Sequence, residues 1–220
     1  GEQRWGYHQF PTISRLPTGP LLITYNVTAD RDAEYGLPGP AHVSYDRGMT
    51  WEKWVPHAPM LAISHSVISE INNGEHLCVP MSPSLDIDAE NIQLPKVSGR
   101  MNVYGEVLFY KYADCESRIQ AFLRELNGVR WTPGGGWQRE TILWDVESAL
   151  VRTRKSDYVI PRAYLDNRIL RVEDSLLYPD FHLQHLLPDG SHPKNYACWL
   201  VCSEDNGRSW KRKGLIAYDD

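Results

Sequence analysis

The residues best suited to chemistry lie in a stretch of alternating charge, in which Asp30, Arg31 and Asp32 precede a bend rich in glycine and proline. A carboxyl group beside a guanidinium and near a second carboxylate can be held ionised or protonated, depending on its burial. Acid/base catalysis on a glycosidic bond requires such a group. Asp30 and Asp32 are therefore catalytic candidates and Arg31 is a substrate-binding candidate; a solvated loop with local charge pairs is the alternative.

A second stretch, from Glu173 to His185, combines carboxylates, aromatic side chains and two histidines. Glu173 directly follows an expected strand, so its position is better fixed than that of a residue at a loop tip. We take Glu173 as the second catalytic carboxylate and Tyr178 as a substrate-binding candidate.

The elements that hold these stretches are indicated by a pattern that occurs twice, Ser-x-Asp-x-Gly-x-Thr/Ser-Trp, at 44–51 and at 203–210. In such a turn the Asp accepts backbone N–H groups, the Gly adopts a positive φ and the Trp packs the turn onto a sheet. The residues expected to build the two turns are Ser44, Asp46, Gly48 and Trp51, and Ser203, Asp205, Gly207 and Trp210.

Through these two copies the chain resembles the Asp-box (BNR-repeat) β-propellers of the sialidase superfamily. The resemblance implies an all-β fold of four-stranded antiparallel blades, arranged in a ring of six. One fold hosts many chemistries, so the motif bears on fold more than on function.

An internal repeat supports this reading, because 10–22 matches 65–77 without a gap and 159–170 is a third copy. In each copy, apolar and polar residues alternate up to a turn that contains Gly or Asn, and an apolar run follows the turn. This pattern predicts the inner hairpin of a blade. We expect one propeller portion over 1–220, with blades at about 7–57, 63–145 and 157–220. Closed propellers use about four to eight blades. The chain is therefore expected to be a portion of a longer propeller or to be completed by one or more further copies, unless the repeat count is wrong.

Further strands are expected to complete each blade. Third strands are predicted at 41–45, 103–112 and 196–202, and outer strands at 52–55, 137–144 and 211–218. The segment 118–126 fits either a short helix or an extra strand. The antiparallel order places long loops at 26–40, 81–102 and 173–195 on one face, away from the Asp boxes. Three long loops on one face predict a binding or catalytic surface.

The resemblance also assigns roles. It implies a catalytic acid/base Asp about fourteen residues before Asp46, which is Asp32, with Asp30 second. Sialidases clamp the carboxylate of sialic acid with arginines. In this chain the position of the first clamp arginine holds Gln9, and the position of the second lies near Val27, where no arginine stands. Arg31 could reach the second position. Gln cannot reproduce the guanidinium fork. We therefore expect an exo-acting glycoside hydrolase for a sugar other than sialic acid.

Two other functions remain open. Some propeller polysaccharide lyases resemble this architecture and use His or Tyr as a base, which makes His8 and His65, at the start of two inner strands, candidates for a reaction on uronates. Arg162 and Arg171 would then neutralise the uronate carboxylate. A non-catalytic glycan-binding propeller is the third possibility.

Composition narrows the partners. The formal net charge of −5 and the absence of a basic stripe argue against nucleic acid, which leaves an oligo- or polysaccharide as the expected partner. No apolar run is long enough for a membrane span, and we expect a secreted, periplasmic or cell-surface location. We expect no cofactor and no metal, because the acidic run Asp86, Asp88 and Glu90 lacks the rest of a calcium loop.

Overall fold

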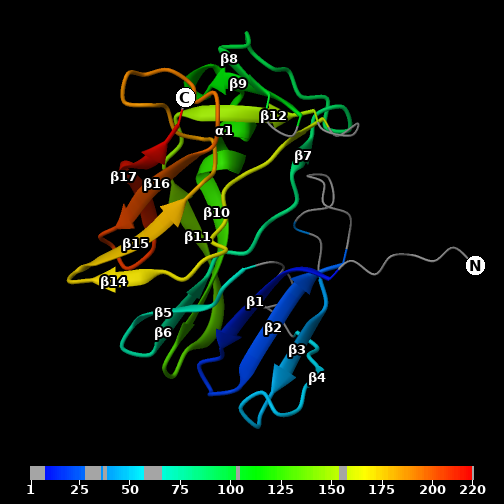
Figure 1. Cartoon of the computed structure of the whole chain (residues 1–220), viewed down its shortest axis with the longest axis vertical. Helices are drawn as coiled ribbons and strands as arrows, with labels where there is room; N and C mark the ends of the chain where they lie inside the picture. The colour runs from blue at the N-terminus through cyan, green and yellow to red at the C-terminus, as the bar shows by residue number, and fades with distance from the viewer. Residues whose placement is uncertain are drawn as a thin grey trace, which may run out of the picture.

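The fold is taken from a computed structural model that describes residues 8–27, 36, 39–56, 66–102, 105–153 and 158–219. These residues form three β-sheets and one short α-helix (Figure 1), so the all-β prediction is confirmed. No helix within the described ranges is long and apolar enough to cross a membrane.

The N-terminal sheet has the strand order that the repeat predicts. It contains β1 (Gln9–Arg15), β2 (Leu21–Asn26), β3 (Ala41–Ser44) and β4 (Glu52–Lys53), antiparallel and in chain order. We refer to it as the first unit. Alternation along β2 buries Leu22 and Thr24 on one face and leaves Ile23 half-buried on the other.

The second sheet has eight strands in two antiparallel halves. The second unit contains β5 (Ser69–Asn72), β6 (Glu75–Cys78), β10 (Glu125–Thr132) and β11 (Gly136–Trp144). The third unit contains β14 (Leu170–Val172), β15 (Ser175–Asp180), β16 (Ala197–Ser203) and β17 (Ser209–Tyr218). Short parallel pairing joins β11 to β17, and β5 approaches β14, so the two units face each other in a nearly closed, barrel-like arrangement.

The third sheet is inserted between these repeats. It contains β7 (Leu85–Asp86), β8 (Gly99–Asn102), β9 (Glu106–Lys111), β12 (Ser148–Arg152) and β13 (Val159–Ile160), in the order β7-β13-β12-β9-β8. After β9, a 3-10 turn (Tyr112–Asp114) leads into helix α1 (Ser117–Arg124). Ile119 and Leu123 of the helix share a buried cluster with this sheet.

Two of the predicted strand assignments are wrong. The expected third strand of the middle unit, 103–112, supplies β9 to the inserted sheet, and β10 takes its place beside β6. The expected inner hairpin at 159–170 does not form, because β13 pairs with β12 and β7, and β14 with β15 forms the hairpin instead. Apolar alternation reports burial in a sheet but does not specify the partner strand. The open segment 118–126 is helix up to Arg124 and strand thereafter.

The first Asp box forms the turn that its residues predict, between β3 and β4. Asp46 Oδ1 accepts the Thr50 N–H at 2.8 Å and Asp46 Oδ2 accepts the Thr50 hydroxyl at 2.6 Å. Ser44 Oγ accepts the Gly48 N–H at 2.7 Å, and the Trp51 indole N–H reaches the Gly48 carbonyl at 3.1 Å. Gly48 has φ +90°, as the motif requires.

The second Asp box, between β16 and β17, repeats these bonds. Asp205 accepts the Ser209 N–H at 2.8 Å and its hydroxyl at 2.6 Å, Ser203 Oγ accepts the Gly207 N–H at 2.8 Å, and the Trp210 indole reaches the Gly207 carbonyl at 3.2 Å. Gly207 has φ +85°. The motif alone therefore specifies the local structure.

Candidate functional site

Several predicted site residues lie outside the described residues: Asp30, Arg31, Asp32 and His65. Their catalytic and binding roles stay predictions. His8 and Gln9 do lie at the start of β1, as expected, and the His8 ring is 5.3 Å from the ring of Tyr25. The side-chain oxygen of Gln9 is buried and accepts no hydrogen bond within the described part of the chain. This buried acceptor stands at the position for which the resemblance predicts the first arginine of the sialidase clamp, and a substrate-binding role for Gln9 stays a prediction.

Glu173 is not in a long loop, so that placement is wrong. It lies in the two-residue turn between β14 and β15, exposed and with φ 53°. Leu176, just beyond this turn, pairs with Ser203, the first residue of the second Asp box. The turn is therefore at the Asp-box end of the third unit, opposite to the segment 181–196 that follows β15.

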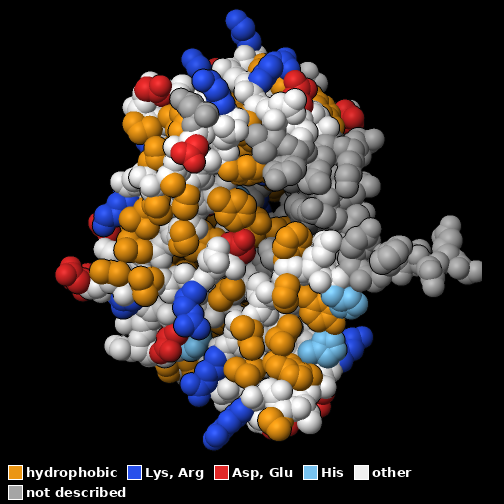
Figure 2. Space-filling view, viewed as in Figure 1, with side chains coloured by type: hydrophobic (Ala, Val, Ile, Leu, Met, Phe, Trp, Pro, Cys, Tyr) orange, Lys and Arg blue, Asp and Glu red, His pale blue; other side chains and the backbone are white. Residues whose placement is uncertain are grey.

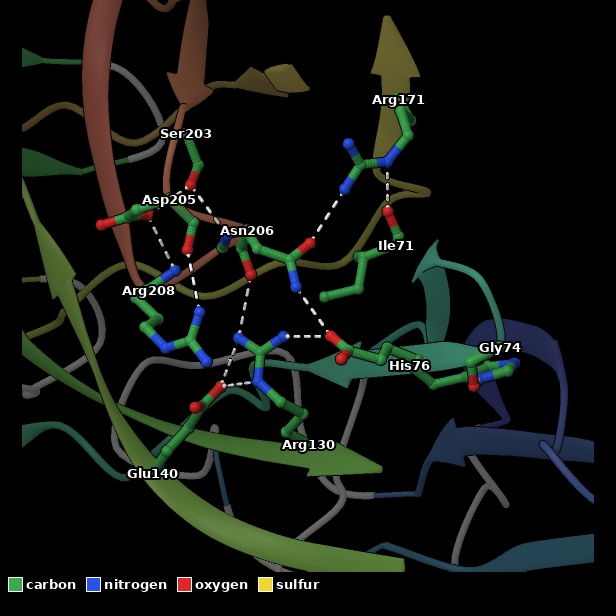
Figure 3. A network of polar contacts seen from close by, with 12 residues as sticks. Ile71, Gly74, His76, Arg130, Glu140, Arg171, Ser203, Asp205, Asn206 and Arg208 are labelled. Carbon is green, nitrogen blue, oxygen red and sulfur yellow. Dashed lines mark hydrogen bonds and ion pairs between the residues drawn. The ribbon is translucent and has the colours of Figure 1, made fainter. Parts of the chain in front are cut away.

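Arg171 belongs to the same end and holds the second Asp box (Figure 3). Its Nη2 donates to Asn206 Oδ1 at 2.8 Å, and Asn206 Nδ2 donates to Glu75 at 2.7 Å. Arg130 donates to the Asn206 carbonyl at 3.0 Å and to Glu140 at 2.8 Å. Arg171 Nε also donates to the Ile71 carbonyl at 2.5 Å, which links the third unit to the second; its ligand role stays a prediction.

Tyr178 and Arg162 are also used in packing. Tyr178 is fully buried and donates its hydroxyl to Asp166 at 2.6 Å; burial, and then Asp166, raise the pKa of Tyr178 well above its usual value. Arg162 lies over the Phe122 ring and donates to the carbonyl of Glu125 at 3.0 Å, and burial lowers the pKa of its guanidinium to about 10. A ligand at either residue would have to displace these contacts.

The described residues also bring together a group of buried and half-buried polar side chains at the other end of the third unit. We refer to Asp180, His182, His185, Glu147 and Arg212 as the histidine–carboxylate cluster. Asp180, the last residue of β15, is fully buried, and its Oδ1 accepts a hydrogen bond from His182 Nδ1 at 2.5 Å. Its Oδ2 lies 3.7 Å from Nε2 of His185, which is also fully buried.

Glu147 extends the cluster from the segment before β12. Its Oε2 lies 3.8 Å from His185 Nδ1, 2.8 Å from Arg212 Nη1 and 2.9 Å from the backbone N–H of Leu186. The neighbouring His185 lowers the pKa of Glu147, as do the Leu186 N–H and the Arg212 guanidinium, against the opposing effect of burial. Glu147 is therefore ionised at neutral pH, and Arg212 supplies its counter-charge.

Unpaired polar atoms are concentrated in this cluster. Asp180 Oδ2, His182 Nε2, Gln184 Oε1 and both ring nitrogens of His185 are buried without a hydrogen-bond partner within the described ranges. A buried polar atom without a partner costs about 1–3 kcal/mol and calls for a specific explanation. The same ranges contain no group of three or more His, Cys, Asp or Glu side chains that could hold a metal ion.

Two aromatic side chains border the cluster. The Tyr164 ring meets the His182 ring edge-on at 4.7 Å, and Phe181 stacks on His182 at 4.9 Å while remaining 37% exposed. An imidazole that has one fixed nitrogen and one uncommitted nitrogen, beside aromatic rings on which a sugar could stack, is suited to proton transfer on a carbohydrate.

The sequence pattern points to this stretch through Glu173, which follows β14 directly but lies at the other end of the third unit from the histidine–carboxylate cluster, so its catalytic role stays a prediction. The signal for Asp180 was present, because alternation from Leu176 through Tyr178 places Asp180 on the buried face, two residues before His182.

Comparisons with known proteins bear on the fold alone. No family model and no curated protein matches the sequence. A crystal structure of a protein of unknown function from Dyadobacter fermentans DSM 18053 is similar, with a TM-score of 0.54 at 17% identity; the match covers 99% of this chain and 57% of that one. The chain thus spans little more than half the length of that protein.

Sialidases are among the structural neighbours at low identity. Trypanosoma rangeli sialidase in complex with sialic acid has a TM-score of 0.32 at 9% identity, over 94% of this chain and 37% of that one. The Hadza microbial sialidase Hz136 has a TM-score of 0.35 at 11% identity, over 93% and 46%. These scores are too low to carry an argument about activity.

Proposed function

We propose that the protein is a carbohydrate-active enzyme with a sialidase-like propeller arrangement, which cleaves a glycosidic bond in a glycan without sialic acid. Two Asp boxes with matching internal bonds support the arrangement, and Gln9 in place of an arginine argues against a sialoside. The observation that carries the proposal is the bond from His182 to the buried Asp180, with His182 Nε2 left uncommitted.

Asp180 would set the protonation of His182. With Nδ1 as the donor to Asp180 Oδ1, 2.5 Å away, the neutral imidazole would keep its lone pair on Nε2. Nε2 is buried in the structure described, so hydrolysis requires a movement that exposes it; Nε2 would then remove a proton from the water that attacks the anomeric carbon. The bond from that carbon to the leaving oxygen breaks, and the oxygen takes a proton from a carboxylic acid, for which Asp32 is the predicted group.

The contact between Tyr164 and His182 favours a second candidate, a lyase acting on uronates. His182 would then remove the proton from the carbon that carries the uronate carboxylate. The carbon–oxygen bond on the neighbouring carbon breaks, a carbon–carbon double bond forms, and the leaving oxygen is protonated, with Tyr164 as the donor. This route needs no water.

A polysaccharide panel with and without uronic acids tests both routes. Each route creates new reducing ends, but only elimination produces a double bond that absorbs in the ultraviolet. We expect H182Q to lower the rate at least about 100-fold, because it removes the base. D180N should lower the rate to a similar extent, because the preferred tautomer of His182 is lost. D32N should abolish hydrolysis but leave elimination unaffected. The melting temperature of each variant shows whether it is folded.

A matched control is H76Q, since His76 lies at the Asp-box end, where its Nδ1 contacts the Gly74 carbonyl. H76Q should retain the wild-type rate. Full activity in folded H182Q would remove His182 from the mechanism, and tight glycan binding without any reaction would identify a glycan-binding protein.

A further inference from the structure

The inner hairpins of the three units can be aligned through their strand register. The equivalent pairs across the two inner strands are Ser14 with Leu22, Ser69 with Leu77, and Leu170 with Leu177. Each position of one unit therefore has a counterpart in the other two. Burial of counterparts can then be compared directly.

The exposed fraction of the leucine in the second strand shows whether the face that points to the following unit is covered. Leu22 and Leu77 are 1% and 0% exposed, because the second and third units respectively cover them. Their counterpart Leu177 is only half-buried, and Leu170 beside it is 60% exposed. The third unit thus keeps the apolar face of an interface without a partner among the described residues.

The isoleucine that immediately precedes Ser14, Ser69 or Leu170 shows whether the opposite face is covered. Ile68 and Ile169 are 5% and 4% exposed, and their N–H groups donate to Ser14 Oγ at 2.9 Å and to Ser69 Oγ at 3.0 Å in the preceding unit. Their counterpart Ile13 is 57% exposed. The same interface is therefore built twice among the described residues, and within these residues the first and third units each leave one face of it uncovered.

We refer to the open side of the first unit, with Ile13, Ile23 and Tyr25, as the leading face, and to the open side of the third unit, with Leu170 and Leu177, as the trailing face. Figure 2 shows hydrophobic side chains gathered over the first unit, in the lower part of the view, and over the third unit at the left.

We propose that a second copy of this chain covers both faces, so that the leading face of each copy packs on the trailing face of the other. The two internal interfaces support this pairing, because in each of them a face of the leading type packs on a face of the trailing type. Two identical head-to-tail contacts close into a two-fold ring. Two copies of three units make six, within the range of about four to eight that closed propellers use.

Light scattering after size exclusion tests the pairing without any activity assay. The wild-type chain should show twice its mass of 25.3 kDa. I13K and L170E should each shift the mass to a single chain, because each places a charge in both contacts of the ring. Since both side chains are more than half exposed in the single chain, circular dichroism should show a native spectrum.

Mixing the two variants distinguishes head-to-tail pairing from other dimers. A mixed ring has one contact of wild-type residues and one contact in which the I13K and L170E substitutions face each other with opposite charges. Equimolar I13K and L170E should therefore restore the double mass.

A matched control is M49K, since Met49 is 83% exposed in the first Asp box; it should leave the mass unchanged. A wild-type mass of one chain, an open polymer, or a dimer that only one of the two face variants disrupts would overturn the proposal. None of these results depends on His182, so they leave the proposed chemistry unaffected.

Discussion

The two Asp boxes have the same internal hydrogen bonds but very different surroundings. Trp51 of the first box is 37% exposed, whereas Trp210 of the second is 1% exposed and packs between the second and third units. The first box is followed by the two-residue strand β4, and the second by the ten-residue strand β17. A local motif thus specifies a turn, and its neighbours decide how much of the fold depends on it.

The largest contrast is expected for the two tryptophans. W210A should lower the free energy of unfolding by about 4 kcal/mol, because it leaves a cavity in the core. W51A should cost about 1 kcal/mol, mainly the bond to the Gly48 carbonyl. Urea unfolding followed by circular dichroism measures both, and equal losses would show that the boxes are energetically alike despite their burial.

The two glycines should differ next most. Both need a positive φ, which costs a non-glycine residue about 1–2 kcal/mol. A Cβ at Gly48 would meet nothing closer than 3.6 Å, but at Gly207 it would lie 2.7 Å from Leu77 Cδ2 in the core. We expect G48A to cost about 1 kcal/mol and G207A about 3 kcal/mol.

Thermal unfolding of these two variants, compared at matched pH, provides the measurement. Because the backbone requirement is shared, the difference between the two losses isolates the contact with Leu77. A smaller loss for G207A than for G48A would mean that the core around Leu77 moves without cost.

The smallest effect is expected from acid. The Thr50 hydroxyl first, and then the Thr50 N–H and Ser44, lower the pKa of Asp46 from 3.8 to about 2. A pKa lowered in the folded state stabilises the fold above the unfolded value and loses this contribution as pH falls through the folded value. The stability difference between wild type and D46N should therefore be constant above pH 4 and shrink toward pH 2.

The second box refines this test. At Asp205 burial raises the pKa, but bonds from Ser209, Ser203 and the Arg208 N–H outweigh it and leave the pKa lowered. The difference in stability between wild type and D205N should therefore also shrink as pH falls. An NMR carboxyl titration of either Asp with a midpoint at its usual value would contradict the assignment.

Prediction from sequence succeeded where the determining contacts are close along the chain. The Asp boxes depend on residues within eight positions, and the outer strands 137–144 and 211–218 follow from alternation near a turn. Prediction failed where a segment had several possible partners, as for β13, whose apolar pattern suits an inner hairpin but which pairs with β7 and β12.

The candidate site follows the same division. Its residue types were visible in the stretch 173–185, and Glu173 does directly follow a strand, β14, but a two-residue turn and β15 replace the start of the long loop expected there. Glu147 and Arg212 could not be linked to His185 beforehand, because they come from distant segments.

By itself, the sequence determined the all-β class, the inner hairpins of the first two units and the two Asp-box turns, because short-range hydrogen bonds and side-chain alternation specify them. Only the tertiary structure decided that His182 bonds to the buried Asp180, that Arg130 and Arg171 hold the second box, and that Ile13 and Leu170 are exposed. Each of these depends on which surfaces meet across long separations, and the pattern of neighbouring residues does not encode that choice locally.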